Sequence, residues 1–234
     1  MSSQTKMNYT GNELELFAHA LQWKRYWSSL VHPYIKGDVL EVGSGLGANI
    51  RFLYQKNTKS WTALEPDLSL LEASRGILND LPVQFIHGDL CVIERTPIYD
   101  TILYIDVLEH IEHDRAEIVE AMARLRSGGH LIILVPAFMF LYSLYDSAIG
   151  HFRRYTRPSL RQIIPSGLSE ARLIYLDAPG MTLSLSNRIF LKQKEPTIKQ
   201  ILFWDRFIVP LSRIADPVVA YSFGRSLLGI WTLQ

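Results

Sequence analysis

The chain has 234 residues, 48% of them apolar, enough to bury a full core in one domain or a small pair. Its formal net charge of +1 provides no basic field for nucleic acid, and its single cysteine, Cys91, excludes an internal disulfide and a cysteine-based zinc site. Residues 1–16 contain no secretory apolar core, and the longest apolar run, 131–142, is too short to span a bilayer. These features predict a soluble protein of the reducing cytoplasm.

Apolar spacing predicts an N-terminal helix over 13–31, after which strand-like and helical segments alternate. The predicted strands are 38–42, 61–65, 83–88, 100–106, 130–136, 171–178 and 226–233. Such alternation predicts an α/β fold with a parallel sheet that is covered by helices on both faces.

Local signals predict where three helices begin. Asp67 is a good N-cap, and Pro158 suits the first turn of a helix. Asp114 with Glu117 has the spacing of a capping box, and the pair of glycines at 128–129 would close that helix. The sequence has no repeat or linker, so we expect one domain over 1–234 with a helical cap at about 10–35 and an insertion at about 180–222.

A glycine-rich turn follows the first predicted strand, in E-V-G-S-G-L-G (residues 41–47). Glycines between a strand and a helix let the backbone approach a ligand that a Cβ would exclude. A carboxylate here, Glu41, would repel a pyrophosphate but suits a cationic amino-acid group. Glu65 ends the second strand about 20 residues later, where an acid can bind both hydroxyls of a ribose. The pair predicts a nucleoside with a zwitterionic tail, S-adenosylmethionine.

Four segments in order, E-V-G-S-G-L-G (41–47), L-E-P-D (64–67), H-G-D-L (87–90) and Y-I-D-V-L-E-H-I (104–111), resemble the motifs of class I S-adenosylmethionine-dependent methyltransferases. The resemblance covers 38–136 well and the remainder loosely. It implies a Rossmann-like, doubly wound, mostly parallel sheet of seven strands whose last strand is antiparallel.

The resemblance also assigns cofactor contacts, with S-adenosyl-L-methionine as the cofactor. The glycine turn would pass the methionine part, Glu65 would hold the ribose, and Asp106 would face the methionine end. Asp89 would meet the adenine amino group. The implied cofactor-binding residues are Glu41, Gly43, Ser44, Gly45, Gly47, Glu65, Asp89, Leu90 and Asp106. Glu65 and Asp89 could instead be ordinary acids at a strand end and a turn.

The methyl acceptor is expected to be a small molecule. The chain lacks an Asn-Pro-Pro-Tyr-type motif and a catalytic cysteine motif after the fourth predicted strand, which distinguishes it from methyltransferases that modify nucleic acids. Asp106, Glu109 and His110 resemble a pattern that quinone-biosynthesis O-methyltransferases associate with a divalent ion. The same L-E-H-I is widespread without a metal, so we expect a wall of the cofactor pocket and no metal.

A second cluster, G-H-F-R-R-Y-T-R-P-S-L at 150–160, resembles one found after the fifth strand in bacterial methyltransferases of glycan, lipid or secondary-metabolite pathways. Histidine can accept a proton near neutral pH, so His151 is the candidate general base. Arg153 and Arg154 could bind a carboxylate or phosphate of the acceptor, and Tyr155 could touch it. The alternative is that one arginine binds a carboxylate of the scaffold and His151 caps a helix.

Aromatic segments at 17–27, 137–145 and 203–208 could cover the pocket and exclude water, which is consistent with a lipophilic acceptor. A membrane-surface helix at 201–211 is an alternative that the sequence does not favour, because this segment lacks a strong basic face.

Two other kinds of protein stay open. A nicotinamide-dependent oxidoreductase would need G-x-G-x-x-G, and the chain also lacks a Tyr-x-x-x-Lys pair. A non-catalytic subunit that binds S-adenosylmethionine would keep the same cofactor motifs.

Overall fold

One seven-stranded sheet forms the centre of the computed structural model, which describes residues 13–190 and 197–234. The strand order is β3-β2-β1-β4-β5-β7-β6, and β7 runs antiparallel to β5 and β6. The strands are β1 (Gly37–Val42), β2 (Thr58–Glu65), β3 (Val83–His87), β4 (Tyr99–Ile105), β5 (Leu125–Pro136), β6 (Leu168–Leu176) and β7 (Ser226–Leu233). The predicted fold class is confirmed.

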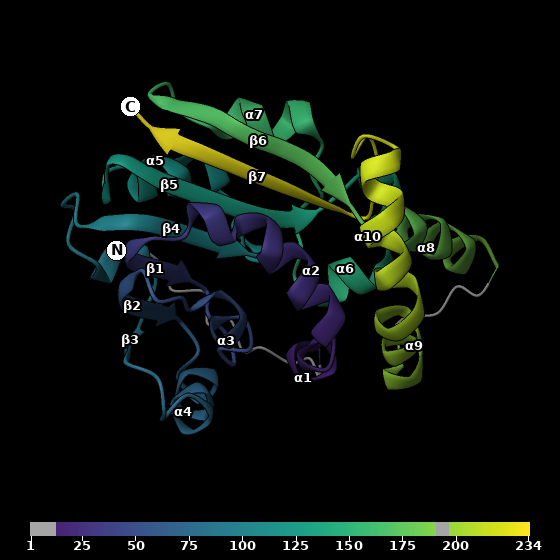
Figure 1. Ribbon diagram of the computed structural model, residues 1–234, viewed down its shortest axis with the longest axis horizontal. Coiled ribbons are helices and arrows are strands. Elements are labelled where there is room, and N and C mark those ends of the chain that lie inside the picture. Colours follow the sequence, from purple (N-terminus) through teal and green to yellow (C-terminus); the bar gives the residue numbers. More distant parts are fainter. Residues whose placement is uncertain (1–12, 191–196) are drawn as a thin grey trace.

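Helices cover both faces of this sheet (Figure 1). The α-helices are α1 (Glu13–Ala18), α2 (Leu21–Val31), α3 (Ile50–Leu53), α4 (Leu68–Ile77), α5 (Asp114–Met122), α6 (Leu144–Ala148), α7 (Arg157–Ile163), α8 (Ala178–Phe190), α9 (Ile198–Phe203) and α10 (Val209–Val218). Short 3₁₀ helices are η1 (His32–Tyr34), η2 (Leu90–Val92), η3 (Leu108–His110) and η4 (Met139–Leu141), and η5 (Trp204–Ile208) is a π-helical turn.

The central strands bury side chains on both faces, as their continuous apolar runs predict. Along β5, Leu131, Ile133 and Val135 pack into one core cluster, together with α5 and α7. Ile132 and Leu134 point to the opposite cluster, which contains α2 and the helices before β7. Successive side chains of a strand alternate between faces, so one apolar run supplies both cores.

Several predicted helix boundaries are wrong. The predicted N-terminal helix is in fact two helices, α1 and α2. The capping box at Asp114 is absent, because α5 already includes Asp114 and its N-cap, His113, has no side-chain cap bond. Glu117 accepts a hydrogen bond from the Tyr104 hydroxyl instead. The glycines at 128–129 lie inside β5. Asp67 and Pro158 do begin helices as predicted.

The segment before β7 is helical, with α8, α9, η5 and α10 packed along one side of the sheet (Figure 1). Some predicted segments lie outside the described residues. These are residues 10–12 of the expected cap, residues 191–196 of the expected insertion, and most of the segment 1–16, in which no secretory apolar core was found. No helix in 13–190 or 197–234 has the length and apolarity needed to cross a membrane.

The sheet topology determines where a ligand can bind. Strand β1 pairs with β2 on one side and with β4 on the other, so the order of the parallel strands reverses there. In open α/β sheets the crevice beyond the carboxyl ends of such strands is the usual ligand site. The glycine turn and Asp106 both lie at that edge.

Candidate active site

A cavity of about 980 Å³ opens at the carboxyl ends of β1, β2 and β4. Its volume is in the range of cofactor and small-molecule sites. The glycine turn and Glu65 line one part, Asp106 and His151 line another, and aromatic side chains close it. The aromatic lining residues are Phe17, Trp23, Trp27, Tyr142, Tyr145 and Trp204.

The glycine turn lies against the ends of β2 and β4. The N–H groups of Gly43 and Ser44 donate to the carbonyl of Leu64. Gly43 has φ of 67°, and a Cβ there would come within 2.6 Å of Val107, so only glycine fits. Ser44 Oγ is buried in the cavity wall and has no hydrogen-bond partner among the described residues. The turn therefore presents backbone and one hydroxyl to a ligand.

Glu65 connects the turn to the end of β2. Its carboxylate accepts hydrogen bonds from the N–H groups of Gly45 at 2.8 Å and Asp67 at 2.9 Å. Burial raises the pKa of Glu65, while these two N–H groups favour its charged form. Because each carboxylate oxygen accepts more than one hydrogen bond, Glu65 can still accept bonds from two ribose hydroxyls.

Glu41 lies behind the turn and not in the cavity lining. Burial raises its pKa to about 8, although the side chains of Asn49 and Trp61 favour the charged form. Gly47 is also outside the lining, and a Cβ there would collide with Leu78 and Ser74. The structure thus packs Glu41 and Gly47 behind the turn, outside the cavity in which contacts with the methionine part are expected.

Asp89 and Leu90 lie away from the lining as well. Asp89 is exposed and caps η2, with Oδ1 accepting the N–H of Cys91 at 2.9 Å. Leu90 is buried in the core beside α5 and packs there. The observed contact of Asp89 is therefore that of an ordinary acid in a turn, which was the alternative to a contact with adenine.

Asp106 faces the cavity at the end of β4. Its φ of 53° is unusual for a residue with a side chain, and its N–H donates to Leu134 of β5. Desolvation by the surrounding protein raises the pKa of Asp106 to about 6, and the electrostatic interactions with His151 and Lys24 oppose this shift. A strained backbone is one way to direct a polar side chain into a site.

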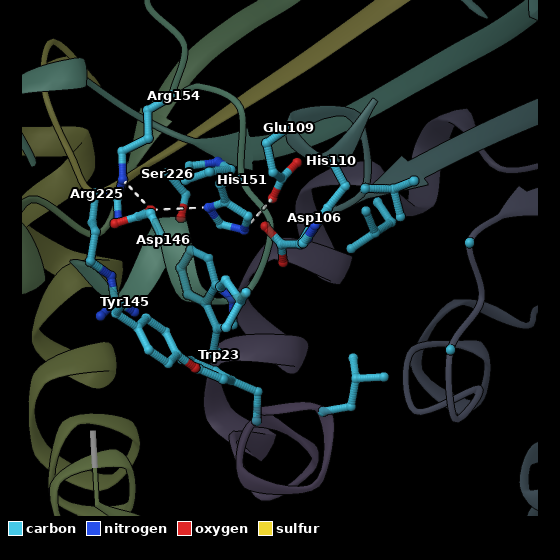
Figure 2. Close-up of a pocket in the computed structure, with 18 of the residues that line it drawn as sticks. Trp23, Asp106, Glu109, His110, Tyr145, Asp146, His151, Arg154, Arg225 and Ser226 are labelled. Atoms are coloured by element: carbon cyan, nitrogen blue, oxygen red, sulfur yellow. Dashed lines mark hydrogen bonds and ion pairs between the residues drawn. The ribbon is translucent and has the colours of Figure 1, made fainter. Parts of the chain in front are cut away.

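His151 is held by Asp146, a residue that the sequence analysis missed (Figure 2). Nδ1 of His151 lies 3.0 Å from Oδ1 of Asp146, and Nε of Arg154 donates to the same oxygen at 2.7 Å. Burial alone would raise the pKa of Asp146, but the bonds from His151 and Arg154 hold it well below its usual range. An ionised Asp146 favours a proton on Nδ1, which leaves a lone pair on Nε2 of neutral His151, and this Nε2 lies 3.7 Å from Oε1 of the buried Glu109 (Figure 2).

Arg153 and Tyr155 do not line the cavity, in contrast to the sequence prediction. Arg153 forms an ion pair with Asp114 and donates to the carbonyl of Glu112. The hydroxyl of the buried Tyr155 donates to Asp114 at 2.7 Å. His151 and Arg154 therefore face the cavity while these two bind the scaffold, a division that strict alternation along an extended segment would not produce.

Two further cations line the cavity. Burial lowers the pKa of Lys24 to about 8, and the charges of Asp106 and Asp205 oppose this shift. Arg225 stacks over Trp204 at 4.2 Å and pairs with Asp177. No local sequence motif marks Lys24, which lies in α2, or Arg225, which is the residue before β7. Of the residues that the sequence did not indicate, Asp146 alone has a local signal. It forms a capping box with Ser143 and lies five residues before His151.

Three side chains could together ligate a metal ion. Glu109, His110 and His151 each offer one ligand atom, and these atoms lie within 4.8 Å of one another. Burial, together with the neighbouring His151 side chain, lowers the pKa of His110 to about 4, so His110 is neutral at physiological pH. The rings of His110 and His151 meet edge to face at 4.5 Å. His151 thus has two chemically reasonable roles, as base or as ligand.

The chain belongs to a methyltransferase family. A family model described as "Methyltransferase domain" matches residues 17–165. Comparison with curated proteins finds no match.

Solved structures share the fold at low sequence identity. A phosphoethanolamine N-methyltransferase of Haemonchus contortus, solved with S-adenosyl-L-methionine, is 14% identical with a TM-score of 0.64, over 97% of this chain and 58% of that one. A suggested methyltransferase of Bacillus halodurans C-125 is 15% identical with a TM-score of 0.61, over 89% and 97%. An N-methyltransferase of Bradyrhizobium japonicum WM9 is 15% identical with a TM-score of 0.55, over 95% and 97%.

Proposed function

We propose that this chain is an S-adenosylmethionine-dependent methyltransferase that transfers a methyl group to an oxygen, nitrogen or carbon atom of a small, lipophilic or anionic molecule. The observation that carries the proposal is one continuous cavity, which joins the glycine turn and Glu65 to His151 and Arg154. Such a cavity can hold a methyl donor and an acceptor side by side.

The donor would lie along the glycine turn. The buried Ser44 hydroxyl suits a polar group of the methionine part, and Glu65 suits the ribose. Asp106 suits the ammonium group, because it faces the cavity at the adjacent strand end. Bound there, S-adenosylmethionine would supply an electrophilic methyl group on its sulfonium. The protein then has to align an acceptor behind that methyl, a contribution of up to roughly 7–11 kcal/mol.

The acceptor would lie beside His151, Arg154 and Arg225. His151 could take a proton from a hydroxyl or amine through Nε2, because Asp146 holds the other nitrogen. The guanidinium groups could bind an anionic group of the acceptor. The aromatic side chains in the lining exclude water and favour an apolar body.

Methyl transfer to a panel of small molecules, measured with a labelled methyl group on S-adenosylmethionine, tests the proposal. Acceptors with a carboxylate or phosphate on an apolar body are expected to be labelled. Binding of S-adenosylmethionine without transfer to any acceptor would favour the non-catalytic subunit. Binding of NAD in place of S-adenosylmethionine would favour the oxidoreductase.

Removal of the Glu65 carboxylate is expected to weaken donor binding. Glu65→Ala should weaken S-adenosylmethionine binding by about 1–3 kcal/mol in titration calorimetry, because two ribose hydroxyls lose a charged acceptor. Glu72→Ala on the exposed surface of α4 is the control and should keep full affinity. Wild-type affinity in a folded Glu65→Ala protein would refute this pose of the donor.

Chelation of divalent ions separates the two roles of His151. We expect turnover to be unchanged after treatment with EDTA, because the sulfonium already activates the methyl group and His151 can accept the proton without a metal. Turnover that falls on chelation and returns with added Mg²⁺ or Mn²⁺ would assign Glu109, His110 and His151 to a metal instead.

A further inference from the structure

Residues 197–218 form a helical column on the side of the molecule that lies away from β3 (Figure 1). Its inner residues pack on the domain and are partly or fully buried: Ile201, Trp204, Asp205, Ile208, Val209, Ser212 and Asp216. Its outer face, as we define it, consists of the exposed residues Ile198, Lys199, Leu202, Phe203, Arg206, Phe207, Pro210, Leu211, Arg213, Ile214, Pro217 and Val218. Seven of these are large apolar side chains exposed to solvent.

A π-helical turn keeps the apolar residues on this outer face. Pro210 has no N–H to continue the α-helical pattern, and the N–H of Val209 donates to the carbonyl of Trp204, five residues back. The wider turn shifts the register by one residue. Trp204 and Val209 therefore share the inner side, while Phe207 and Leu211 share the outer side.

The charges of the column are divided between its two sides. Both acids in 197–218 point inward. Asp205 accepts the N–H groups of Gln22 and Trp23, and Asp216 accepts the Tyr26 hydroxyl. Lys199, Arg206 and Arg213 are exposed. The sequence alone shows mixed charges here, whereas the folded outer face carries three cations and no anion.

We propose that this outer face docks on the surface of an anionic lipid membrane. Exposed Phe and Leu side chains flanked by Arg and Lys are typical of helices that lie in the membrane interface and bind anionic headgroups. A second copy of the chain fits this outer face less well than a membrane does, because a symmetric contact would bring the three cations of one face against the three cations of the other. The proposal concerns a surface, so it holds or fails independently of the proposed chemistry.

The first test is flotation of the full-length protein with lipid vesicles. The protein is expected to float with vesicles that contain phosphatidylglycerol, and far less with pure phosphatidylcholine. High salt should weaken the binding, because it screens the cations. Failure to float with anionic vesicles at low salt would overturn the proposal.

The apolar part of the face is tested by Phe207→Ser/Leu211→Ser, which removes side chains that are 56% and 50% exposed. The partition coefficient on anionic vesicles should fall about 30-fold or more, because both side chains lose their burial among acyl chains. The matched control is Leu68→Ser/Ile77→Ser on α4, with side chains 53% and 49% exposed, which should bind as the wild type does. If the double variant folds poorly, Val218→Ser tests the same apolar face with a single substitution. Equal losses in variant and control would overturn the proposal.

The charged part is tested by Arg206→Gln/Arg213→Gln against Lys56→Gln/Lys59→Gln, two exposed lysines near and on β2. The first pair should lower binding about 10- to 30-fold, since each surface cation contributes roughly fivefold, and the second pair should have little effect. Sedimentation of the protein without lipid tests whether a second copy of the chain binds the outer face instead. A wild-type dimer that Phe207→Ser/Leu211→Ser converts to a monomer would identify a protein interface and overturn membrane docking.

Discussion

Replacement of His151 with alanine is expected to lower kcat about 100-fold or more while S-adenosylmethionine affinity stays nearly unchanged. The reason is geometric: Asp146 binds Nδ1 of His151, so the loss removes an oriented Nε2 lone pair that can accept the acceptor's proton as the methyl moves. Interactions made only in the transition state lower kcat without a change in binding. Initial rates with a neutral hydroxyl or amine acceptor, together with calorimetry of donor binding, measure this effect.

Arg154→Ala provides the contrast. Arg154 lines the cavity and shares Asp146 with His151, so its loss should chiefly raise the KM of an anionic acceptor. An acceptor that is already ionised at the assay pH needs no base. With such an acceptor, the loss of kcat in His151→Ala should be smaller. Wild-type kcat in His151→Ala on an un-ionised acceptor would contradict the base role.

The sheet could be predicted from the sequence because each central strand is a continuous apolar run. Residues 130–136 show this pattern, and β5 buries its side chains on both faces. Helix ends were less predictable, because tertiary contacts override local signals. Asp114 has the sequence of a capping residue, but Tyr155 and Arg153 bind its carboxylate, so its helix begins one residue earlier than a cap would require.

The donor side of the site could be predicted further than the acceptor side. Gly43 and Glu65 lie on consecutive strand ends, and strand order alone brings them together. Arg225 reaches the same cavity only because β7 inserts between β5 and β6 and places the residue before it near Asp177. No pattern near Arg225 indicates that path. The direction of each side chain in 151–155 likewise depends on an irregular backbone, which the run of charges does not reveal.

Loss of the Asp216 carboxylate is expected to destabilise the whole fold by about 3–5 kcal/mol. Asp216 is buried in α10 and accepts three hydrogen bonds, from the Tyr26 hydroxyl at 2.8 Å and from the N–H groups of Asp177 at 2.7 Å and Ala178 at 2.9 Å. These donors belong to α2, to the residue after β6 and to the first residue of α8, so one carboxylate joins the N-terminal helices, the end of the sheet and α10. Asp216→Ala would leave all three donors buried without an acceptor.

Urea unfolding followed by circular dichroism measures the effect, as a lower midpoint with an unchanged slope. The control is Asp80→Ala, which removes an exposed ion pair with Arg51 and should cost less than about 1 kcal/mol. We propose that the chain is a single domain with the insertion as an integral part, which requires one cooperative transition in both variants. If Asp216→Ala unfolds in two steps, with an early loss of helix and a later wild-type midpoint, the insertion is a separate unit and the single-domain proposal is wrong.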